Sequence, residues 1–187
     1  KRQDIDPDRI AVAGHSEGGL IAPLVASTDS RVRAVALLAG PAYSGRRVLV
    51  YQNELGIRAI PGFTDAQRDS VRRTIPGALD SLARANPWFN YFINVDPAVA
   101  LRKVKQPVLV LQGNTDTQVS PEQADTLAFI LRKSGNTRVT VQRFPETNHL
   151  FLRDPSGAAS GYSALKDQTI RREVLGALAN FMVTALR

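Results

Sequence analysis

Short apolar runs alternate with amphipathic segments along this sequence, and that alternation restricts the fold more than any other feature. Four runs of the length of buried strands occupy residues 9–13, 33–39, 108–111 and 139–141. Apolar residues at helical spacing follow the first and third runs, and a last amphipathic helix is expected from about residue 167. Because parallel strands that are buried on both faces read as continuous apolar runs, the sequence predicts an α/β fold with a parallel sheet flanked by helices.

Two helix starts carry the residues of a capping box. Ser120 and Gln123, with a proline between them, fit one such box, and Thr64 with Gln67 fits another. The sequence therefore predicts that helices begin beside Ser120 and beside Thr64.

Residues 41–100 interrupt the alternation. They are rich in proline and glycine and contain the one tryptophan of the chain. Because an insertion of this size between core strands typically has a function, we expect residues 1–40 and 101–187 to form the core and residues 41–100 a helical cap. The aromatic side chains expected to line a substrate pocket in this cap are Trp88, Phe89, Tyr91 and Phe92. The alternative is that these aromatics only anchor the cap on the core.

Composition excludes several classes of protein. The 187 residues include no cysteine, which excludes disulfides, thiolate zinc sites and cysteine nucleophiles. No apolar run approaches the roughly 20 residues of a membrane-spanning helix. The formal net charge of +7 comes from basic residues that are scattered among acidic and apolar ones, so we expect a solvated surface and not a nucleic-acid interface.

A serine between two glycines directly follows the first apolar run. Gly14, Ser16 and Gly18 fit the pattern G-x-S-x-G, in which a strained turn from strand to helix projects the serine hydroxyl above the sheet. The two glycines are expected to leave room for this turn to close, and Gly19 to add further clearance. The sequence thus predicts Ser16 as a nucleophile.

The nucleophile needs a base and an acid, and the chain has two histidines. His149 follows the last expected strand, which places it at the carboxyl end of the sheet, where ligands bind in such folds. His15 lies beside the serine, where a packed side chain that points away from the hydroxyl is expected. Asp116 follows the third expected strand and is the favoured acid, ahead of Asp125, which falls within the next expected helix, and Glu146, which lies too close before His149. Neither histidine has carboxylates at zinc-ligand spacing, so we expect no metal and no cofactor.

Residues 5–19, 106–119 and 144–151 resemble the C-terminal part of α/β-hydrolases, in particular bacterial esterases and serine-peptidase-like members. The likeness rests on Asp-Pro-x-Arg-Ile before G-H-S-x-G-G, and on Pro-Val-Leu-Val-Leu-Gln-Gly-x-x-Asp. The order serine, acid, histidine is also that of this family. The resemblance implies Ser16 as nucleophile, His149 as general base and acid, and Asp116 as the residue that orients the imidazole. It also implies that the backbone N–H of Glu17 supplies half of the oxyanion hole.

One departure from the family concerns the start of the chain. A complete α/β-hydrolase has several strands before the nucleophile, and a loop among them supplies the second oxyanion donor. We therefore expect a sheet without its N-terminal strands and with an unpaired edge beside the serine. Since such an edge tends to aggregate, an N-terminal segment or a partner chain that completes the sheet is expected.

The expected function is hydrolysis of carboxylic esters through an acyl-enzyme intermediate. One alternative is an aminopeptidase or dipeptidyl-peptidase-like enzyme of the same fold, which needs an acidic residue in the insertion to bind a substrate amine. The candidates for this role are Glu54, Asp65, Asp69 and Asp80, but charge on a helix surface is the simpler explanation of all four. The other alternative is a binding module that keeps the fold without the activity.

Overall fold

The computed structural model describes residues 4–187 and divides into two compact units. The core unit comprises the chain up to Ala42 together with Pro97–Arg187, and the insertion unit is Tyr43–Asp96. Each unit is described by itself below.

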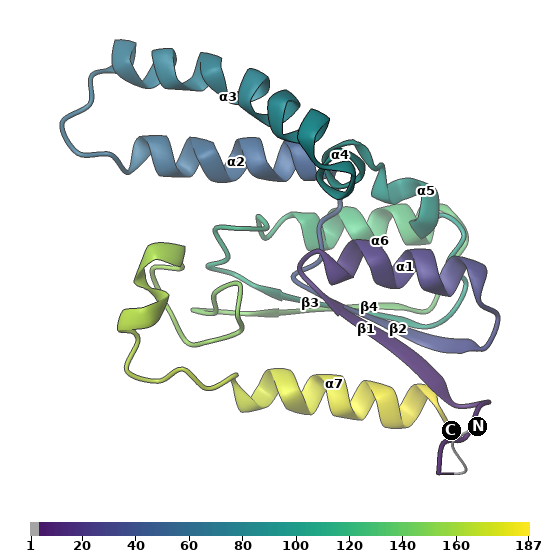
Figure 1. The fold of residues 1–187 in the computed structure, drawn as a ribbon. Helices are drawn as coiled ribbons and strands as arrows, with labels where there is room; N and C mark the ends of the chain where they lie inside the picture. The colour runs from purple at the N-terminus through teal and green to yellow at the C-terminus, as the bar shows by residue number, and fades with distance from the viewer. Residues whose placement is uncertain (1–3) are drawn as a thin grey trace. The chain divides into compact units, whose positions relative to one another are not determined.

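A parallel four-stranded sheet forms the centre of the core unit (Figure 1). Its strands β1 (Ile10–His15), β2 (Val32–Leu38), β3 (Val108–Gly113) and β4 (Val139–Phe144) follow one another in the order β1-β2-β3-β4. Every residue of β3 is buried, whereas β1 and β4 form the two edges and are partly exposed. The predicted parallel sheet is confirmed, and each of its strands lies at one of the expected apolar runs.

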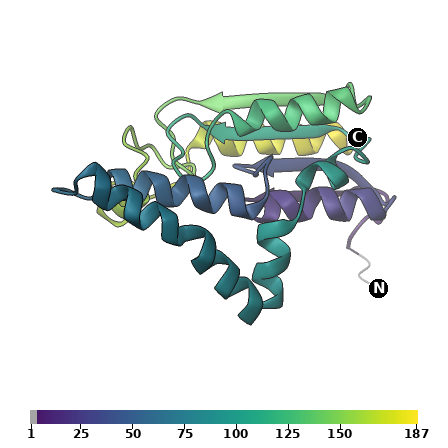
Figure 2. The same ribbon diagram turned by 90° about the horizontal axis from the view of Figure 1, so that it is seen from above.

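Helices cover both faces of this sheet. The helices α1 (Gly18–Thr28), α5 (Pro97–Leu101) and α6 (Gln123–Lys133) lie on one face and α7 (Arg172–Ala185) on the other (Figure 1). Seen from above, α7 lies behind the strands that α1 and α6 cover (Figure 2). Contacts of α1 with β1 and β2, of α6 with β3 and β4, and of α7 with β2 and β3 hold these layers together.

One continuous cluster of apolar side chains lies between the sheet and α7. Leu109 and Leu111 of β3 lie against Phe144, Phe151 and Val174, all of them buried. Burying a side chain of this size contributes roughly 1.5–3 kcal/mol to folding. Since Phe144 and Phe151 flank the segment after β4, this cluster anchors both ends of the loop that contains the second histidine.

The expected start of α6 is wrong by a few residues. The helix begins at Gln123, and its N-cap residue Glu122 makes no side-chain capping bond. The Ser120 hydroxyl bonds the Glu122 carboxylate and accepts a hydrogen bond from Nε2 of Gln123 at 3.1 Å. The side-chain oxygen of Gln123 accepts the N–H of Ala42 at 3.0 Å. This tertiary bond engages the glutamine that a capping box would need.

The C-terminal helix also begins later than expected, at Arg172. Asp167 accepts hydrogen bonds from the N–H and the hydroxyl of Thr169, at 2.9 and 2.6 Å. Such a local turn competes with helix formation, because the aspartate satisfies the backbone in another conformation. A short 3-10 helix, η1 (Ala159–Ala164), precedes this turn.

The insertion unit consists of three helices, α2 (Gly45–Arg58), α3 (Asp65–Ala85) and α4 (Pro87–Asn94). The capping box predicted at Thr64 is confirmed. The Thr64 hydroxyl accepts a hydrogen bond from the backbone N–H of Gln67 at 3.3 Å, and the Gln67 side chain accepts one from the backbone N–H of Thr64 at 2.8 Å.

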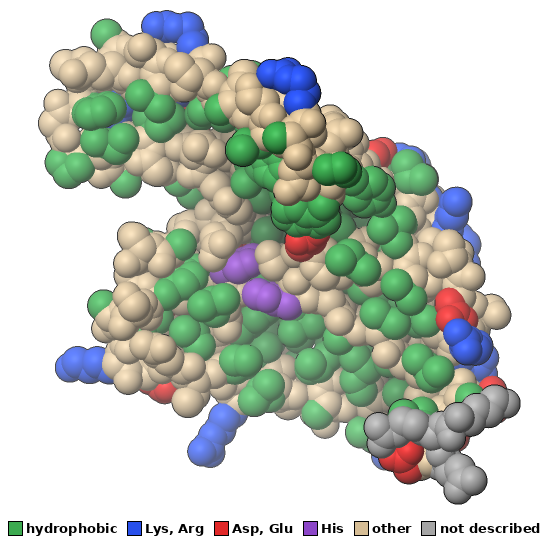
Figure 3. Space-filling model, in the orientation of Figure 1, with side chains coloured by type: hydrophobic (Ala, Val, Ile, Leu, Met, Phe, Trp, Pro, Cys, Tyr) green, Lys and Arg blue, Asp and Glu red, His purple; other side chains and the backbone are tan. Residues whose placement is uncertain are grey.

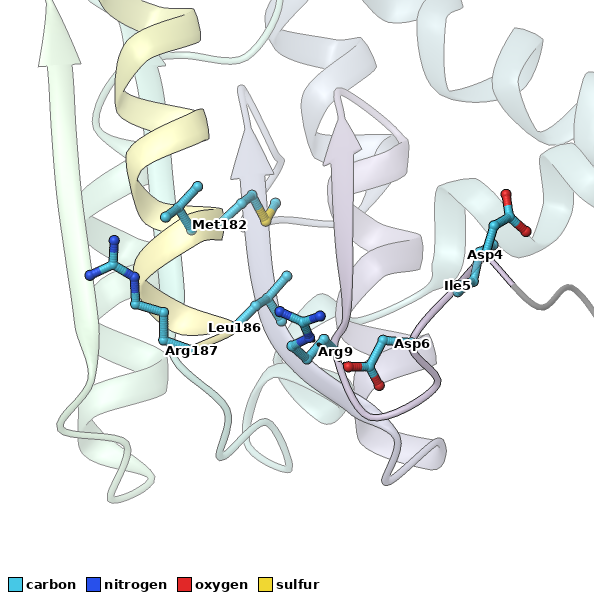
Figure 4. Close-up of a pocket in the computed structure, with 8 residues that line it drawn as sticks. Asp4, Ile5, Asp6, Arg9, Met182, Leu186 and Arg187 are labelled. Carbon is cyan, nitrogen blue, oxygen red and sulfur yellow. Dashed lines mark hydrogen bonds and ion pairs between the residues drawn. The ribbon is translucent and has the colours of Figure 1, made fainter.

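A hollow of about 580 Å³ lies in the core unit between the segment before β1 and the last turn of α7 (Figure 4). Ile5, Met182 and Leu186 give it a mainly apolar lining, and Arg9 contributes a cation that pairs with Asp6 at 2.6 Å. The hollow lies beside the start of β1, whereas the residues of the candidate site follow the ends of the strands. Within residues 4–187, every helix is too short or too polar to span a lipid bilayer.

Close contact between α1 and the turn after β2 gives a stability prediction. A Cβ atom on Gly19 would lie 2.5 Å from the Cα of Gly40, so Gly19→Ala must move one of two backbone segments. We expect this substitution to lower the free energy of unfolding by about 1–3 kcal/mol. Gly176→Ala in α7 is the control: its Cβ meets nothing within 4 Å, so it should stabilise by roughly 0.5–1 kcal/mol. Equal unfolding midpoints in urea for both variants would contradict the prediction.

Candidate active site

Ser16 occupies a strained turn between β1 and α1. Its φ of 54° lies in the left-handed region, which costs a residue other than glycine about 1–3 kcal/mol. Two main-chain hydrogen bonds hold the turn: the N–H of Ser16 donates to Leu38 at 2.9 Å, and the N–H of Gly19 donates to Ser16 at 2.8 Å. This is the strand–turn–helix context that the serine motif requires.

The glycines around Ser16 differ in their importance for this turn. A Cβ on Gly14 would lie 1.9 Å from the carbonyl oxygen of Gly18, so glycine is needed there for backbone clearance. A Cβ on Gly18 would meet no atom within 4 Å. The expectation that both flanking glycines provide room is therefore right for Gly14 and wrong for Gly18, and the clearance expected of Gly19 is present.

Backbone strain is concentrated at the carboxyl edge of the sheet. Four residues other than glycine have positive φ in the described part of the chain: Ser16, Ala39, Glu146 and Phe151. The first follows β1, the second follows β2, and the last two follow β4. Because strained residues persist only where their surroundings hold them, this pattern marks the edge as a candidate functional site.

Asp116 is a buried carboxylate whose two oxygens are both engaged. Oδ1 accepts the backbone N–H groups of Gln118 at 2.8 Å and Val119 at 2.9 Å. Oδ2 lies 2.9 Å from Nε2 of Gln112 and 2.8 Å from Nδ1 of His149. With 2% of its surface exposed, Asp116 relies on these partners in place of water.

His149 is held by this carboxylate in a defined orientation. Only 3% of the residue is exposed. Since a carboxylate accepts hydrogen bonds, Nδ1 carries the proton in the neutral ring, and Nε2 then has a free electron pair that can accept one. In the described residues, no hydrogen bond joins Nε2 of His149 to the Ser16 hydroxyl. The structure thus brings Asp116 and His149 into contact, and connects them to the serine turn through His15, whose ring centroid lies 4.8 Å from that of His149.

A buried amide shapes the loop that contains His149. Oδ1 of Asn148 accepts the N–H groups of Leu150 at 3.0 Å and Leu152 at 3.1 Å. Its Nδ2 donates to Asp154 at 3.3 Å. Burial raises the pKa of Asp154, but the hydrogen bonds that it accepts outweigh this effect and the pKa lies below its ordinary value. The carboxylate is therefore ionised and is a strong acceptor for the amide.

The loop with Asp116 and the loop with His149 are also joined directly. The Thr115 hydroxyl donates to the carbonyl of Asp154 at 2.6 Å, and the Thr117 hydroxyl donates to that of Gly157 at 2.6 Å. Gly157 has a φ of 64°, and a Cβ there would lie 1.6 Å from the carbonyl oxygen of Thr115. Acid and base are therefore held in one connected framework.

Sequence reasoning missed the side chains that support the acid and the base. Nε2 of Gln112 donates to Asp116 and, at 3.2 Å, to the carbonyl of Val119, and its Oε1 is buried without a partner in the described residues. The sequence does contain signals for these supporting side chains. Gln112 is an amide at the end of an apolar strand, and Asn148 directly precedes His149. The hydroxyl oxygen of Tyr162 also lies nearby and accepts a hydrogen bond from Nε2 of Gln118 at 3.4 Å. Burial raises the pKa of this phenol.

The aromatic residues expected to bind substrate lie on α4 of the insertion unit. Trp88 stacks on Phe92, with ring centroids 5.7 Å apart and planes at 6°, and Phe89 contacts both rings. Tyr91 of the same helix is 56% exposed, and Trp88 is 55% exposed. Their role in substrate binding stays a prediction.

The four carboxylates considered as sites for a substrate amine are all paired with arginines of the insertion unit. Glu54 pairs with Arg58 and Arg72 at 2.7 Å, and Arg72 also pairs with Asp69 at 2.6 Å. The other two pairs are Asp65 with Arg68 at 3.8 Å and Asp80 with Arg46 at 2.6 Å. The structure therefore favours the interpretation of these residues as surface charge. Residues 4–187 contain no group of three or more histidines and carboxylates that could hold a metal ion.

The network around Asn148 gives a stability prediction. Asn148→Ala leaves the buried N–H of Leu152, the partly buried N–H of Leu150 and one carboxylate oxygen without their partner, and a buried group that loses its partner costs about 1–3 kcal/mol. We expect the free energy of unfolding to fall by at least about 2 kcal/mol in urea titrations. Asn180→Ala, on the exposed side of α7, is the control and should change it by less than about 0.5 kcal/mol. A loss for Asn148→Ala no larger than for the control would contradict the network.

Comparisons with known proteins agree with this architecture. The family described as "BAAT / Acyl-CoA thioester hydrolase C terminal" matches residues 1–156. A thermostable carboxylesterase cloned from a metagenomic library has a TM-score of 0.59 and 21% identity, and the match covers 98% of this chain and 57% of that one. An esterase of Pyrococcus furiosus has a TM-score of 0.56 and 14% identity over 96% of this chain and 54% of its own. An acylaminoacyl peptidase of Pyrococcus horikoshii has a TM-score of 0.56 and 16% identity over 97% of this chain and 24% of its own.

These similarities show the fold of the core unit. At such identities the solved structures establish the α/β-hydrolase fold alone, and the predicted resemblance to that fold is confirmed. The chain spans about half the length of the two esterases. No curated protein sequence matches.

Proposed function

This chain belongs to the BAAT / acyl-CoA thioester hydrolase C-terminal family, and we propose that it is a serine hydrolase that cleaves carboxylic esters. The observation that carries this proposal is the buried hydrogen bond between His149 and Asp116, at the edge where Ser16 occupies a strained turn. A histidine held by a carboxylate beside a strained serine is the arrangement that acyl transfer by serine requires.

In the proposed reaction, Nε2 of His149 takes the proton of the Ser16 hydroxyl while Oγ attacks the ester carbonyl carbon. The backbone N–H of Glu17 donates to the oxyanion that forms, and the leaving alcohol takes the proton back from Nε2 as the C–O bond breaks. Water then attacks the acyl-enzyme with the same proton transfers, which releases the acid and restores the hydroxyl. Asp116 stabilises the imidazolium that forms on His149 through its hydrogen bond to Nδ1.

Thioesters are the second candidate substrates, and the family description favours them. Attack on the carbonyl is the same, but a thiolate leaves more readily than an alkoxide because its conjugate acid has a lower pKa. A peptidase is less well supported, because the four candidate carboxylates of the insertion are engaged by arginines. The aromatic cluster of Trp88, Phe89 and Phe92, with Tyr91 nearby in sequence, is proposed to bind an apolar acyl group.

A fluorophosphonate probe tests the nucleophile. The parent chain should be labelled covalently, because the probe reacts with an activated serine, and Ser16→Ala should not be labelled. Ser30→Ala, which removes an exposed serine, is the control and should be labelled like the parent. Intact-protein mass spectrometry gives the readout. Absence of labelling in the parent would favour a binding module without activity, and labelling of Ser16→Ala would show that the nucleophile is another residue.

Turnover of para-nitrophenyl esters tests the acid. In Asp116→Asn the amide would place an N–H against Nδ1 of His149, which favours the tautomer that cannot accept the serine proton. We expect kcat to fall by about 10⁴-fold, as in serine proteases. Asp125→Asn is the control, because this carboxylate lies in α6 and pairs with Arg143, and its kcat should match that of the parent. Turnover of Asp116→Asn close to that of the parent would show that the acid is misassigned.

A substrate panel separates the candidate reactions. Para-nitrophenyl esters, acyl-CoA thioesters and aminoacyl anilides would be compared by kcat/KM on the same preparation, with Ser16→Ala as the blank. The proposal expects esters or thioesters to exceed the anilides. A preference for the anilides would support the peptidase.

A further inference from the structure

We propose that His15 is a positioning residue for His149. The hydrogen bond from the His15 imidazole to the main-chain carbonyl of His149 keeps the His149 base in position relative to the Ser16 turn. This inference rests on the proposed role of His149 as the general base. The sequence motif around Ser16 leaves the residue at position 15 unspecified, so the motif alone assigns His15 no role.

The geometry joins the two histidines in two ways. Nε2 of His15 lies 2.8 Å from the carbonyl oxygen of His149. The two ring planes are tilted by 44° to each other, with centroids 4.8 Å apart, and the ring of Phe151 meets His15 edge-on at 6.0 Å. Figure 3 shows the two histidine side chains next to each other.

The hydrogen bonds fix opposite tautomers on the two rings. A carbonyl oxygen can only accept, so Nε2 of His15 carries a proton. A carboxylate can only accept as well, so the neutral His149 carries its proton on Nδ1. His15 is therefore an Nε2–H donor, and His149 is an Nδ1–H donor with a basic Nε2.

The charge state of His15 suits this role. Partial burial of the ring lowers its pKa, and the positive charge of a protonated His149 lowers it further. The hydrogen bond to the His149 carbonyl and the charge of Asp116 act in the opposite direction, but the pKa of His15 remains below its ordinary value of 6.5. At neutral pH His15 is uncharged, so it does not oppose the imidazolium that forms on His149 in the proposed reaction.

The position of His15 makes this bond a direct link between nucleophile and base. His15 is the last residue of β1 and precedes Ser16, whereas His149 belongs to a loop with left-handed residues on both sides, Glu146 and Phe151. Within residues 4–187, the His149 carbonyl accepts no other hydrogen bond. Loss of the His15 donor would thus free the base loop from the serine turn.

Nitrogen-15 NMR of histidine-labelled protein tests the link without any need for activity. The chain contains two histidines, so each ring gives its own set of signals. At pH 8 the parent should show one ring as Nε2–H and the other as Nδ1–H. His15→Phe retains a ring but removes the donor to the His149 carbonyl, and we expect the His149 ring signals to shift and broaden while Asp116 keeps the ring as Nδ1–H. His15→Gln is the matched variant, because its amide nitrogen can donate from a similar position, and we expect its His149 signals to match those of the parent.

Ester hydrolysis provides the second readout. We expect His15→Phe to lower kcat about tenfold at unchanged KM, the effect of one net hydrogen bond of typical strength, and His15→Gln to stay within about twofold of the parent. Rescue by glutamine separates positioning from simple packing, which phenylalanine would preserve better. If His15→Phe fails to fold, the parent spectrum and His15→Gln still decide the question.

The possible outcomes separate this inference from the proposed function. Failure of the parent to react with fluorophosphonate would refute the serine mechanism, and the spectra would still show whether His15 orders the His149 ring. The inference is overturned if His15 is the Nδ1–H tautomer in the parent. It is also overturned if His15→Phe leaves the His149 signals unchanged, or if His15→Gln perturbs them as much as His15→Phe does.

Discussion

The hydrogen bond between Nδ1 of His149 and Asp116 is the interaction on which the rest of the site depends. Both side chains are buried, so water cannot take the place of either partner in this hydrogen bond. The carboxylate is further satisfied by the Gln112 side chain and two backbone N–H groups, which makes a buried negative charge tolerable. Because this bond fixes the tautomer of His149, it decides which ring nitrogen is left to act as a base.

The parallel sheet makes this bond possible by bringing the ends of β1, β3 and β4 to one edge. The loops after these strands are then joined to one another. Threonine hydroxyls connect the acid loop to the loop beyond His149, Asn148 and Asp154 order that loop from within, and His15 reaches it from β1. The strained φ angles at the same edge persist because several independent hydrogen bonds hold each segment.

The insertion unit combines two features of different character. Its surface is covered by arginine–carboxylate pairs, which contribute little stability individually when they are exposed. Its α4 helix gathers three aromatic rings and leaves Trp88 more than half exposed. An exposed aromatic group of this kind is suited to an apolar ligand, which is why the proposed acyl-binding role is assigned to α4 and not to the charged helices.

The sequence by itself determined the four strands, the family resemblance and the helix start at Thr64, because apolar periodicity, the serine motif and a capping box are local patterns. It also nominated Ser16, Asp116 and His149, whose catalytic roles stay predictions. Only the tertiary structure decided the partners of these residues and the starts of α6 and α7. Gln123 is engaged by Ala42, 81 positions away, and His15 bonds His149 across 134 positions. Hydrogen bonds of this range depend on which strand ends and loops meet after folding, and no local pattern specifies that.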